Sequence, residues 1–100
     1  MDHKRLGRTG LKVSRLCLGT MTFGNQCDEA TSQAILDYAL DAGISFIDTA
    51  DIYPANGVPD LVGETENIIG RWMKSRREDV VLATKFWAPT GKNPWQGGSS

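Results

Sequence analysis

Three side chains near the ends of two apolar runs are of types that could carry out acid–base chemistry together. Asp48 and Tyr53 come from FIDTADIY (46–53), and Lys85 lies in VVLATKFW (80–87). A tyrosine donates a proton near neutral pH only if a nearby positive charge stabilises the phenolate that remains. Lys85 would supply that charge, and Asp48 would keep a buried lysine protonated. The trio would deliver a proton to a developing alkoxide, as in the reduction of a carbonyl group.

Each of the three residues also has an ordinary structural role as an alternative. Asp48 could cap a turn, Tyr53 could be a half-buried amphipathic ring, and Lys85 could extend its ammonium from a strand to solvent. Asp51, between Asp48 and Tyr53, is interpreted as a carboxylate that stabilises its own loop, and it is left out of the site. The functional interpretation therefore depends on elements that bring the three side chains together.

Three predicted strands would have to position these residues. The runs 16–21, 44–49 and 80–86 are mainly apolar, a pattern typical of strands buried on both faces. Cys17, in the first run, is predicted to be a small buried hydrophobic residue. Before these strands, residues 4–6 and 11–16 flank the turn Arg8-Thr9-Gly10. They predict a short hairpin in which Gly10 is free to adopt positive φ.

Two helices are predicted between the strands. The first follows Asp28, a suitable N-cap, and ends at Gly43, while the second covers about residues 64–76. Apolar residues recur with helical period in both segments and predict one buried face on each. They are Ala34, Ile35, Tyr38, Ala39 and Ala42 in the first helix, and Ile68, Ile69, Trp72 and Met73 in the second.

The order of these elements is hairpin, then strand–helix–strand–helix–strand, which indicates an α/β protein with a parallel sheet. The first strand is followed by GTMTFGN, which is not the GxGxxG of a doubly wound dinucleotide-binding fold. A (β/α)₈ barrel instead places its active site at the carboxyl ends of its strands. The sequence favours the barrel, because suggestive residues follow every strand: Gly19, Thr20 and Met21, then Asp48 and Tyr53, then Lys85.

Composition excludes several other classes of protein. The chain has 100 residues, a net charge of −1 and 40% hydrophobic residues, which fits one globular domain at most. We expect neither nucleic acid nor a membrane as a partner, because the charge is balanced and no apolar run is long enough to span a bilayer. Cys17 and Cys27 match no disulfide or zinc pattern, and the N-terminus has no signal peptide, so a cytoplasmic location is expected.

The chain resembles the N-terminal part of an aldo-keto reductase. The resemblance is carried, in the order found in that family, by LGRTGLKVSRLCLGTMTFG, GISFIDTADIY and GETENIIGRWMKSRREDVVLATKFW. It implies a (β/α)₈ barrel whose floor is closed by the N-terminal hairpin. It also implies NADPH-dependent reduction of aldehydes or ketones to alcohols, without a metal.

The same resemblance implies roles for individual residues. Tyr53 would be the proton donor, with Asp48 and Lys85 as its charged partners. Gly19, Thr20 and Met21 would border the nicotinamide ribose of NADPH, and Asp48 would lie near that ribose as well. Trp87 and Tyr53 would contact the carbonyl substrate. Two further candidates are Phe23, for the substrate pocket, and Gln26, for the cofactor.

Parts of the family pattern are missing from these 100 residues. The fourth catalytic residue of the family is a histidine on the next strand, whereas His3, the single histidine here, belongs to the hairpin. The basic residues that bind the adenosine 2′-phosphate come from later strands, and a barrel needs about 250 residues. We therefore expect residues 1–100 to be an incomplete segment of one barrel domain, with residues 88–100 as the loop after the third strand.

Two alternatives to a reductase stay open. Some members of this family are cofactor-binding regulatory subunits of potassium channels, and the chain could also be an inactive truncated remnant.

Overall fold

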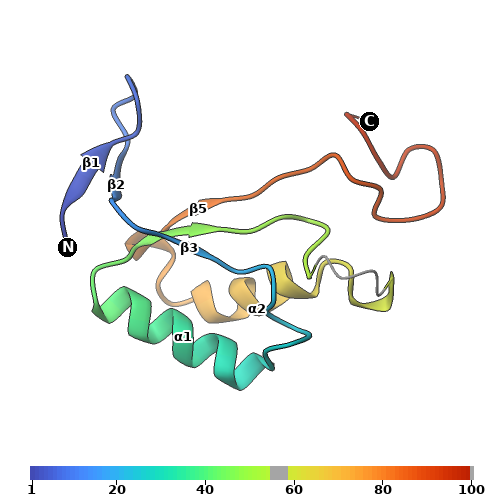
Figure 1. The fold of residues 1–100 in the computed structure, drawn as a ribbon, viewed down its shortest axis with the longest axis horizontal. Coiled ribbons are helices and arrows are strands. Elements are labelled where there is room, and N and C mark those ends of the chain that lie inside the picture. The colour runs from blue at the N-terminus through green and yellow to red at the C-terminus, as the bar shows by residue number, and fades with distance from the viewer. Residues whose placement is uncertain (55–58, 100) are drawn as a thin grey trace.

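The computed structural model describes residues 1–54 and 59–99 and contains two small sheets and two α-helices within them (Figure 1). The predicted hairpin, the alternation of strands and helices, and the parallel sheet are confirmed. The three strands of the parallel sheet are shorter than their apolar runs, and the first hairpin strand lies one residue earlier than predicted. Residues 55–58, within the predicted loop 53–63, and Ser100 lie outside the described residues. The strands are β1 (His3–Arg5), β2 (Lys12–Ser14), β3 (Cys17–Gly19), β4 (Phe46–Asp48) and β5 (Val81–Ala83), and the helices are α1 (Glu29–Asp41) and α2 (Glu64–Met73).

The two sheets differ in the direction in which their strands pair. Strands β1 and β2 pair antiparallel, and β3, β4 and β5 form a parallel sheet in chain order. Short 3₁₀ turns at Pro59–Leu61 and Arg77–Asp79 precede and follow α2. In the hairpin turn the glycine with positive φ is Gly7, at +59°, and not Gly10. The Leu6 carbonyl accepts a hydrogen bond from the backbone N–H of Thr9 at 3.1 Å. Gly7 is therefore a central residue of the four-residue turn between Leu6 and Thr9.

The ends of α1 lie where local sequence signals predict them. Asp28 has extended backbone, and its Oδ1 accepts a hydrogen bond from the Thr31 N–H at 2.8 Å, as a helix N-cap should. Gly43 has φ of +90° and its N–H donates to the Leu40 carbonyl at 3.0 Å. A Cβ at Gly43 would lie 2.7 Å from the Cβ of Met1, so both conformation and space require glycine there.

The buried face of α1 differs from the predicted stripe. Its buried residues are Ser32, Leu36 and Ala39, whereas Ile35 is 37% and Tyr38 79% exposed. Of the predicted stripe, only Ala39 is buried. A polar residue can occupy the buried face here because the Ser32 hydroxyl donates to the Asp28 carbonyl at 2.7 Å, one turn back along the helix.

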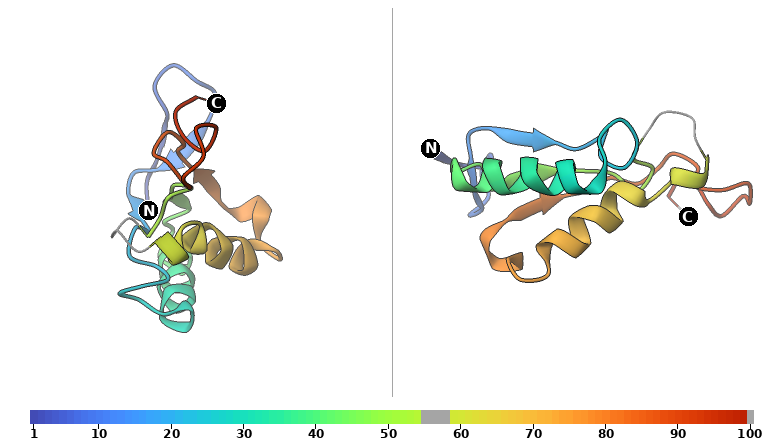
Figure 2. Two further views of the ribbon diagram at one scale, coloured as in Figure 1. Left: turned by 90° about the vertical axis from the view of Figure 1, so that its right-hand side faces the viewer. Right: turned by 90° about the horizontal axis from the view of Figure 1, so that it is seen from below.

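Both helices pack on the same face of the parallel sheet (Figures 1 and 2). The predicted face of α2 is confirmed, because Ile68, Ile69 and Trp72 are buried and Met73 packs against the core. Neither α1 nor α2, the helices of the described residues, is long and apolar enough to cross a membrane. The core between sheet and helices consists of Phe23, Leu36, Ile47, Ile69, Trp72 and Val80.

Burial of the sheet on both faces is not observed. Cys17 and Gly19 of β3 are exposed, Leu18 is half-buried, and all three residues of β5 are intermediate. The prediction that Cys17 is buried is therefore wrong for this structure, and Cys17 and Cys27 are both free thiols. The physical reason is that α1 and α2 cover one face only and that β3 and β5 are the outer strands of the sheet.

Ser14 attaches the hairpin to the parallel sheet. It is 1% exposed, and its Oγ accepts hydrogen bonds from the backbone N–H groups of Ser45 and Phe46, both at 3.2 Å. The same hydroxyl donates to the Leu16 carbonyl at 2.7 Å. Since Phe46 begins β4, the hairpin lies at the amino-terminal end of the sheet, away from the segment 88–99 (Figure 1).

We expect Ser14→Ala in the full-length protein to lower the free energy of unfolding by about 1–3 kcal/mol, because it leaves buried backbone groups without partners. Urea denaturation followed by circular dichroism measures this. Ser75→Ala, at an exposed position after α2, is the matched control and should change the free energy by less than about 0.5 kcal/mol. Equal effects of the two substitutions would contradict the role given to Ser14.

Candidate active site

The register of the parallel sheet places the candidate residues at one edge. Gly19 of β3 is paired with Asp48 of β4, and Asp48 with Ala83 of β5, so these three residues end their strands in a single row. Lys85 follows two residues after β5. The carboxyl ends of the strands therefore bring together residues that the sequence predicted to act together.

Lys85 is the centre of this group. Its Nζ donates hydrogen bonds to Asp48 Oδ2 at 2.7 Å, to the Thr49 carbonyl at 2.9 Å and to Tyr53 Oη at 3.1 Å. The ammonium also lies 4.7 Å from the centre of the Tyr53 ring, a distance at which a cation is attracted to an aromatic face. All three predicted catalytic side chains thus meet around one positive charge.

The site is open to solvent in this part of the chain. The side chains of Lys85 and Asp48 are 50% and 36% exposed, so the expectation of a buried lysine is wrong here. The Asp48 carboxylate first, and the Tyr53 oxygen second, raise the pKa of Lys85 above its usual 10.5. An exposed ion pair of this kind contributes little to stability, and its geometry holds the ammonium 3.1 Å from the Tyr53 oxygen.

Two threonines at the site were not assigned these contacts from sequence. Thr20 is 1% exposed, and its Oγ1 donates to the Asp48 carbonyl at 2.9 Å, so its side chain fixes the end of β4 to the end of β3. Thr49 supplies a backbone carbonyl to Lys85. The Thr49 contact had no signal in the sequence, because any residue has such a carbonyl.

The end of β3 has room for a ligand. Gly19 and Met21 are exposed, and a Cβ built on Gly19 would meet no atom within 4 Å. Asp48, beside Gly19 in the register, presents a partly exposed carboxylate that can accept several hydrogen bonds. An open backbone edge next to an acceptor fits the hydroxyl groups of a nicotinamide ribose, so these residues are compatible with the predicted cofactor. Thr20, in contrast, is only 1% exposed, so Gly19, Met21 and Asp48 are the members of the predicted cofactor group that a ligand could reach.

The aromatic candidates separate into two groups. Trp87 is 70% exposed and lines a shallow depression beyond β5 together with Asp51, Phe86 and Trp95. Asp51 is tied to this strand end, since its backbone N–H donates to the Lys85 carbonyl at 3.1 Å. Phe23, in contrast, is 3% exposed and belongs to the hydrophobic core. Its ring is therefore unavailable to wall a substrate pocket.

The candidate for a weaker cofactor contact, Gln26, is exposed on the loop that follows β3. It lies between Phe23 and Asp28, the N-cap of α1, and the described contacts connect it to neither Asp48 nor Tyr53. The structure therefore brings Asp48, Tyr53 and Lys85 together and leaves Gln26 outside that group.

A pH titration tests the charge at the site. We expect Lys85 to lose its proton above pH 10.5, its usual pKa. Asp48→Asn should lower the pKa of Lys85, because it removes the carboxylate that is the main cause of the shift. NMR of the lysine ¹³Cε signals in the full-length protein measures this, with Tyr38→Phe on α1 as the control. An identical Lys85 titration in Asp48→Asn would contradict the ion pair.

The raised pKa of Lys85 also makes the free energy of unfolding depend on pH. Because the pKa of Lys85 is raised in the folded protein, its contribution to the free energy of unfolding is fully present below about pH 10.5 and is lost as the pH rises through the raised pKa.

Comparison with known proteins agrees with the geometry of the site. Residues 15–100 match the Aldo/keto reductase family. A relative from Bacillus subtilis, the "Uncharacterized oxidoreductase YrpG", is 56% identical over 92 residues, which are 89% of this chain and 27% of that protein. The "Probable voltage-gated potassium channel subunit beta" of rice (Oryza sativa subsp. japonica) is 42% identical over 95 residues, 93% of this chain and 28% of that protein.

A solved structure supports the same assignment. The holo form of aldo-keto reductase AKR11C1 from Bacillus halodurans superposes with a TM-score of 0.75 and 36% sequence identity, and the match covers 98% of this chain and 30% of that one. The structural neighbours are (β/α)₈ barrels, so the hairpin and the three strand units correspond to part of a barrel. The chain spans only 27–28% of the length of the relatives named above. From the match over residues 15–100, the chain belongs to the aldo-keto reductase family.

Proposed function

We propose that the full-length protein containing this chain is an NADPH-dependent oxidoreductase that reduces aldehydes or ketones to alcohols. The observation that carries the proposal is the position of the Lys85 ammonium, 2.7 Å from Asp48 Oδ2 and 3.1 Å from Tyr53 Oη. Membership of a family of oxidoreductases supports the reaction class. The holo form of the solved relative supports a nicotinamide cofactor, and the choice of NADPH is part of our proposal.

The three side chains divide the proton chemistry between them. Tyr53 donates the proton of its hydroxyl to the carbonyl oxygen of the substrate. Lys85 stabilises the phenolate that this leaves, because its charge lies within hydrogen-bond distance of the Tyr53 oxygen. Asp48 orients the ammonium and keeps it protonated. When bound, NADPH supplies the hydride for the carbonyl carbon.

The surroundings of Tyr53 suggest where each ligand would lie. Gly19, Thr20 and Met21, with Asp48, would hold the nicotinamide ribose at the open end of β3. The exposed Trp87, on the segment after β5, would contact the carbonyl compound near Tyr53. The exposure of Gly19, Met21 and Trp87 and the position of Gly19 beside Asp48 in the row of strand ends support this proposal.

We propose further that residues 1–100 are part of one larger barrel domain, in which residues 88–100 form the loop after the third strand. Support comes from the sheet, which is covered on one face only, and from the small share of each relative that the chain spans. The remaining family residues, a histidine and the groups that bind the 2′-phosphate, would lie elsewhere in that domain. A cytoplasmic location is part of the same proposal, and the two free thiols are consistent with it.

Replacement of one atom tests the proton donor. Tyr53→Phe in the full-length protein removes the hydroxyl and keeps the ring, so kcat for NADPH-dependent reduction of an aldehyde should fall by about 10²–10⁴-fold. The dissociation constant for NADPH should change less than threefold, because Tyr53 is assigned to the proton and the substrate. Stopped-flow absorbance at the nicotinamide band and fluorescence titration measure the two quantities.

Tyr38→Phe is the matched control, because Tyr38 is 79% exposed on α1, away from the strand ends. It should leave kcat unchanged. If Tyr53→Phe reduced aldehydes as fast as the wild-type protein, the assignment of Tyr53 would be wrong.

The similarity to the rice protein favours a second candidate function, a cofactor-binding regulatory subunit of a potassium channel. Co-purification of a potassium channel with the full-length protein, together with NADPH turnover too slow to measure at steady state, would favour it over the reductase. If the protein isolated from its native source were no longer than these 100 residues and failed to bind NADPH, the inactive remnant would be favoured instead.

A further inference from the structure

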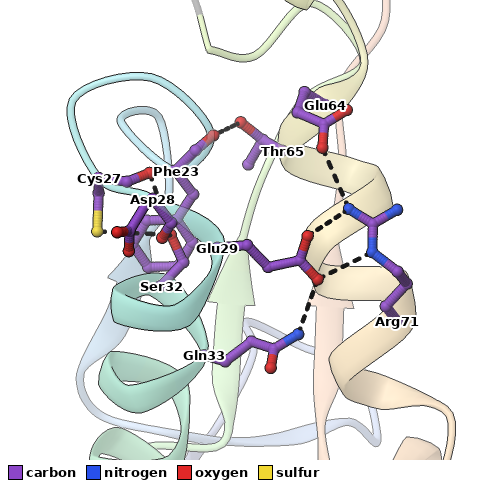
Figure 3. Close-up of polar contacts among 9 residues, drawn as sticks. All are labelled: Phe23, Cys27, Asp28, Glu29, Ser32, Gln33, Glu64, Thr65 and Arg71. Atoms are coloured by element: carbon purple, nitrogen blue, oxygen red, sulfur yellow. Dashed lines mark hydrogen bonds and ion pairs between the residues drawn. The ribbon is translucent and has the colours of Figure 1, made fainter.

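One buried residue on α2 contacts the loops that follow two different strands. Thr65 is fully buried, and its Oγ1 donates a hydrogen bond to the carbonyl of Phe23, in the loop after β3 (Figure 3). Its backbone N–H donates to the carbonyl of Tyr53, after β4, at 3.4 Å, and Gly63 N–H donates to the same carbonyl at 3.2 Å. Thr65 therefore connects the loop 20–28 with the backbone of the proposed proton donor.

The neighbouring residue extends these contacts to the third strand. Glu66 Oε2 accepts a hydrogen bond from the Thr84 hydroxyl at 2.8 Å, and Thr84 directly precedes Lys85. The first turn of α2 thus contacts the segments that follow β3, β4 and β5. These are the segments that carry the proposed cofactor, proton-donor and lysine groups.

Hydrogen bonds connect Phe23, in the loop 20–28, to residues proposed to contact the cofactor. The Phe23 ring lies in the core, and its backbone N–H donates to the Thr20 carbonyl at 3.0 Å. Thr20 in turn is bonded to the Asp48 carbonyl through its hydroxyl. A chain of short contacts therefore runs from Thr65 through Phe23 and Thr20 to Asp48.

A second set of contacts near Thr65 is exposed and contributes less. Arg71 of α2 donates to both carboxylate oxygens of Glu29 on α1, at 2.9 and 2.7 Å, and to Glu64 Oε1 at 3.1 Å (Figure 3). These side chains are 37–46% exposed, and exposed ion pairs are screened by water. Loss of the Thr65 hydroxyl would instead leave a buried carbonyl without its donor, which is far more costly. Of these two sets of contacts made by α2, the Thr65 hydrogen bond is therefore the one that is buried and that reaches the loop 20–28.

We propose that Thr65 is a positioning residue that fixes the loop 20–28 relative to Tyr53, and with it the nicotinamide side of the site relative to the proton donor. This inference rests on the proposed function for its catalytic consequence. Thr65 is assigned no contact with the reacting groups, so its effect would be carried by Phe23 and Tyr53.

The test compares Thr65→Val, which removes the hydroxyl, with Thr65→Ser, which keeps it, in the full-length protein. Thr31→Val, at an exposed position in the first turn of α1, is the matched control. We expect Thr65→Val to speed amide hydrogen exchange of residues 20–28 by about tenfold or more. It should also raise the dissociation constant for NADPH by about tenfold and lower kcat. Thr65→Ser should keep the exchange rate, the dissociation constant for NADPH and kcat near their wild-type values, and Thr31→Val should change none of them.

The possible results distinguish failure of this inference from failure of the proposed function. Unchanged exchange in residues 20–28 of Thr65→Val overturns the inference, whatever the activity. Faster exchange with unchanged NADPH affinity and kcat also overturns it, because Thr65 would then be structural only. A wild-type protein that binds no NADPH overturns the proposed function, while the exchange data still decide whether Thr65 holds the loop. If Thr65→Val does not fold, Thr65→Ala replaces it.

Discussion

The parallel register of β3, β4 and β5 is the constraint on which the candidate site depends. Because Gly19, Asp48 and Ala83 form one row, groups that are distant in the sequence meet at a single edge. Lys85 reaches Asp48 across 37 residues and Tyr53 across 32. A slip of β4 by one residue would turn Asp48 to the opposite face of the sheet. The apolar contacts that fix the register, such as those of Ile47 in the core, are therefore also what assembles the charged site.

The site and the core obtain their properties from different physical sources. Lys85 donates to three oxygens, yet the half-exposed side chain adds little to stability because water screens it. Stability comes instead from burial of the residues between the sheet and the two helices, Leu36, Ile69 and Trp72 among them. An active-site charge can remain accessible to a ligand only if the fold does not rely on burying it. This separation explains why the lysine can stand at the rim of a well-packed sheet.

The order of elements was predictable from sequence, because its signals are local. The Asp48–Tyr53–Lys85 group was predictable because parallel strands end at one edge and because the motifs resemble those of aldo-keto reductases. Caps such as Asp28 and Gly43 mark helix ends, and polar residues interrupt apolar runs where strands end. The face of α1 was not predictable, because apolar residues occur around most of that helix and a polar residue, Ser32, lies on the buried face with its hydroxyl bonded to the Asp28 carbonyl. The exposure of Cys17 likewise depends on which elements cover the sheet. Backbone acceptors such as the Thr49 carbonyl have no sequence signal at all.

The N-terminus of α2 shows how the fold and the site can share one interaction. The first N–H groups of a helix lack partners within the helix, and the N-cap of α2, Gly63, has no side chain to supply one. The Tyr53 carbonyl fills that role by accepting from both Gly63 and Thr65. The helix gains its missing acceptor, and the backbone of Tyr53 is held by a rigid element. The side-chain oxygen of Tyr53 lies 3.1 Å from Lys85 Nζ, so one residue caps the helix through its backbone and contacts the lysine through its phenol.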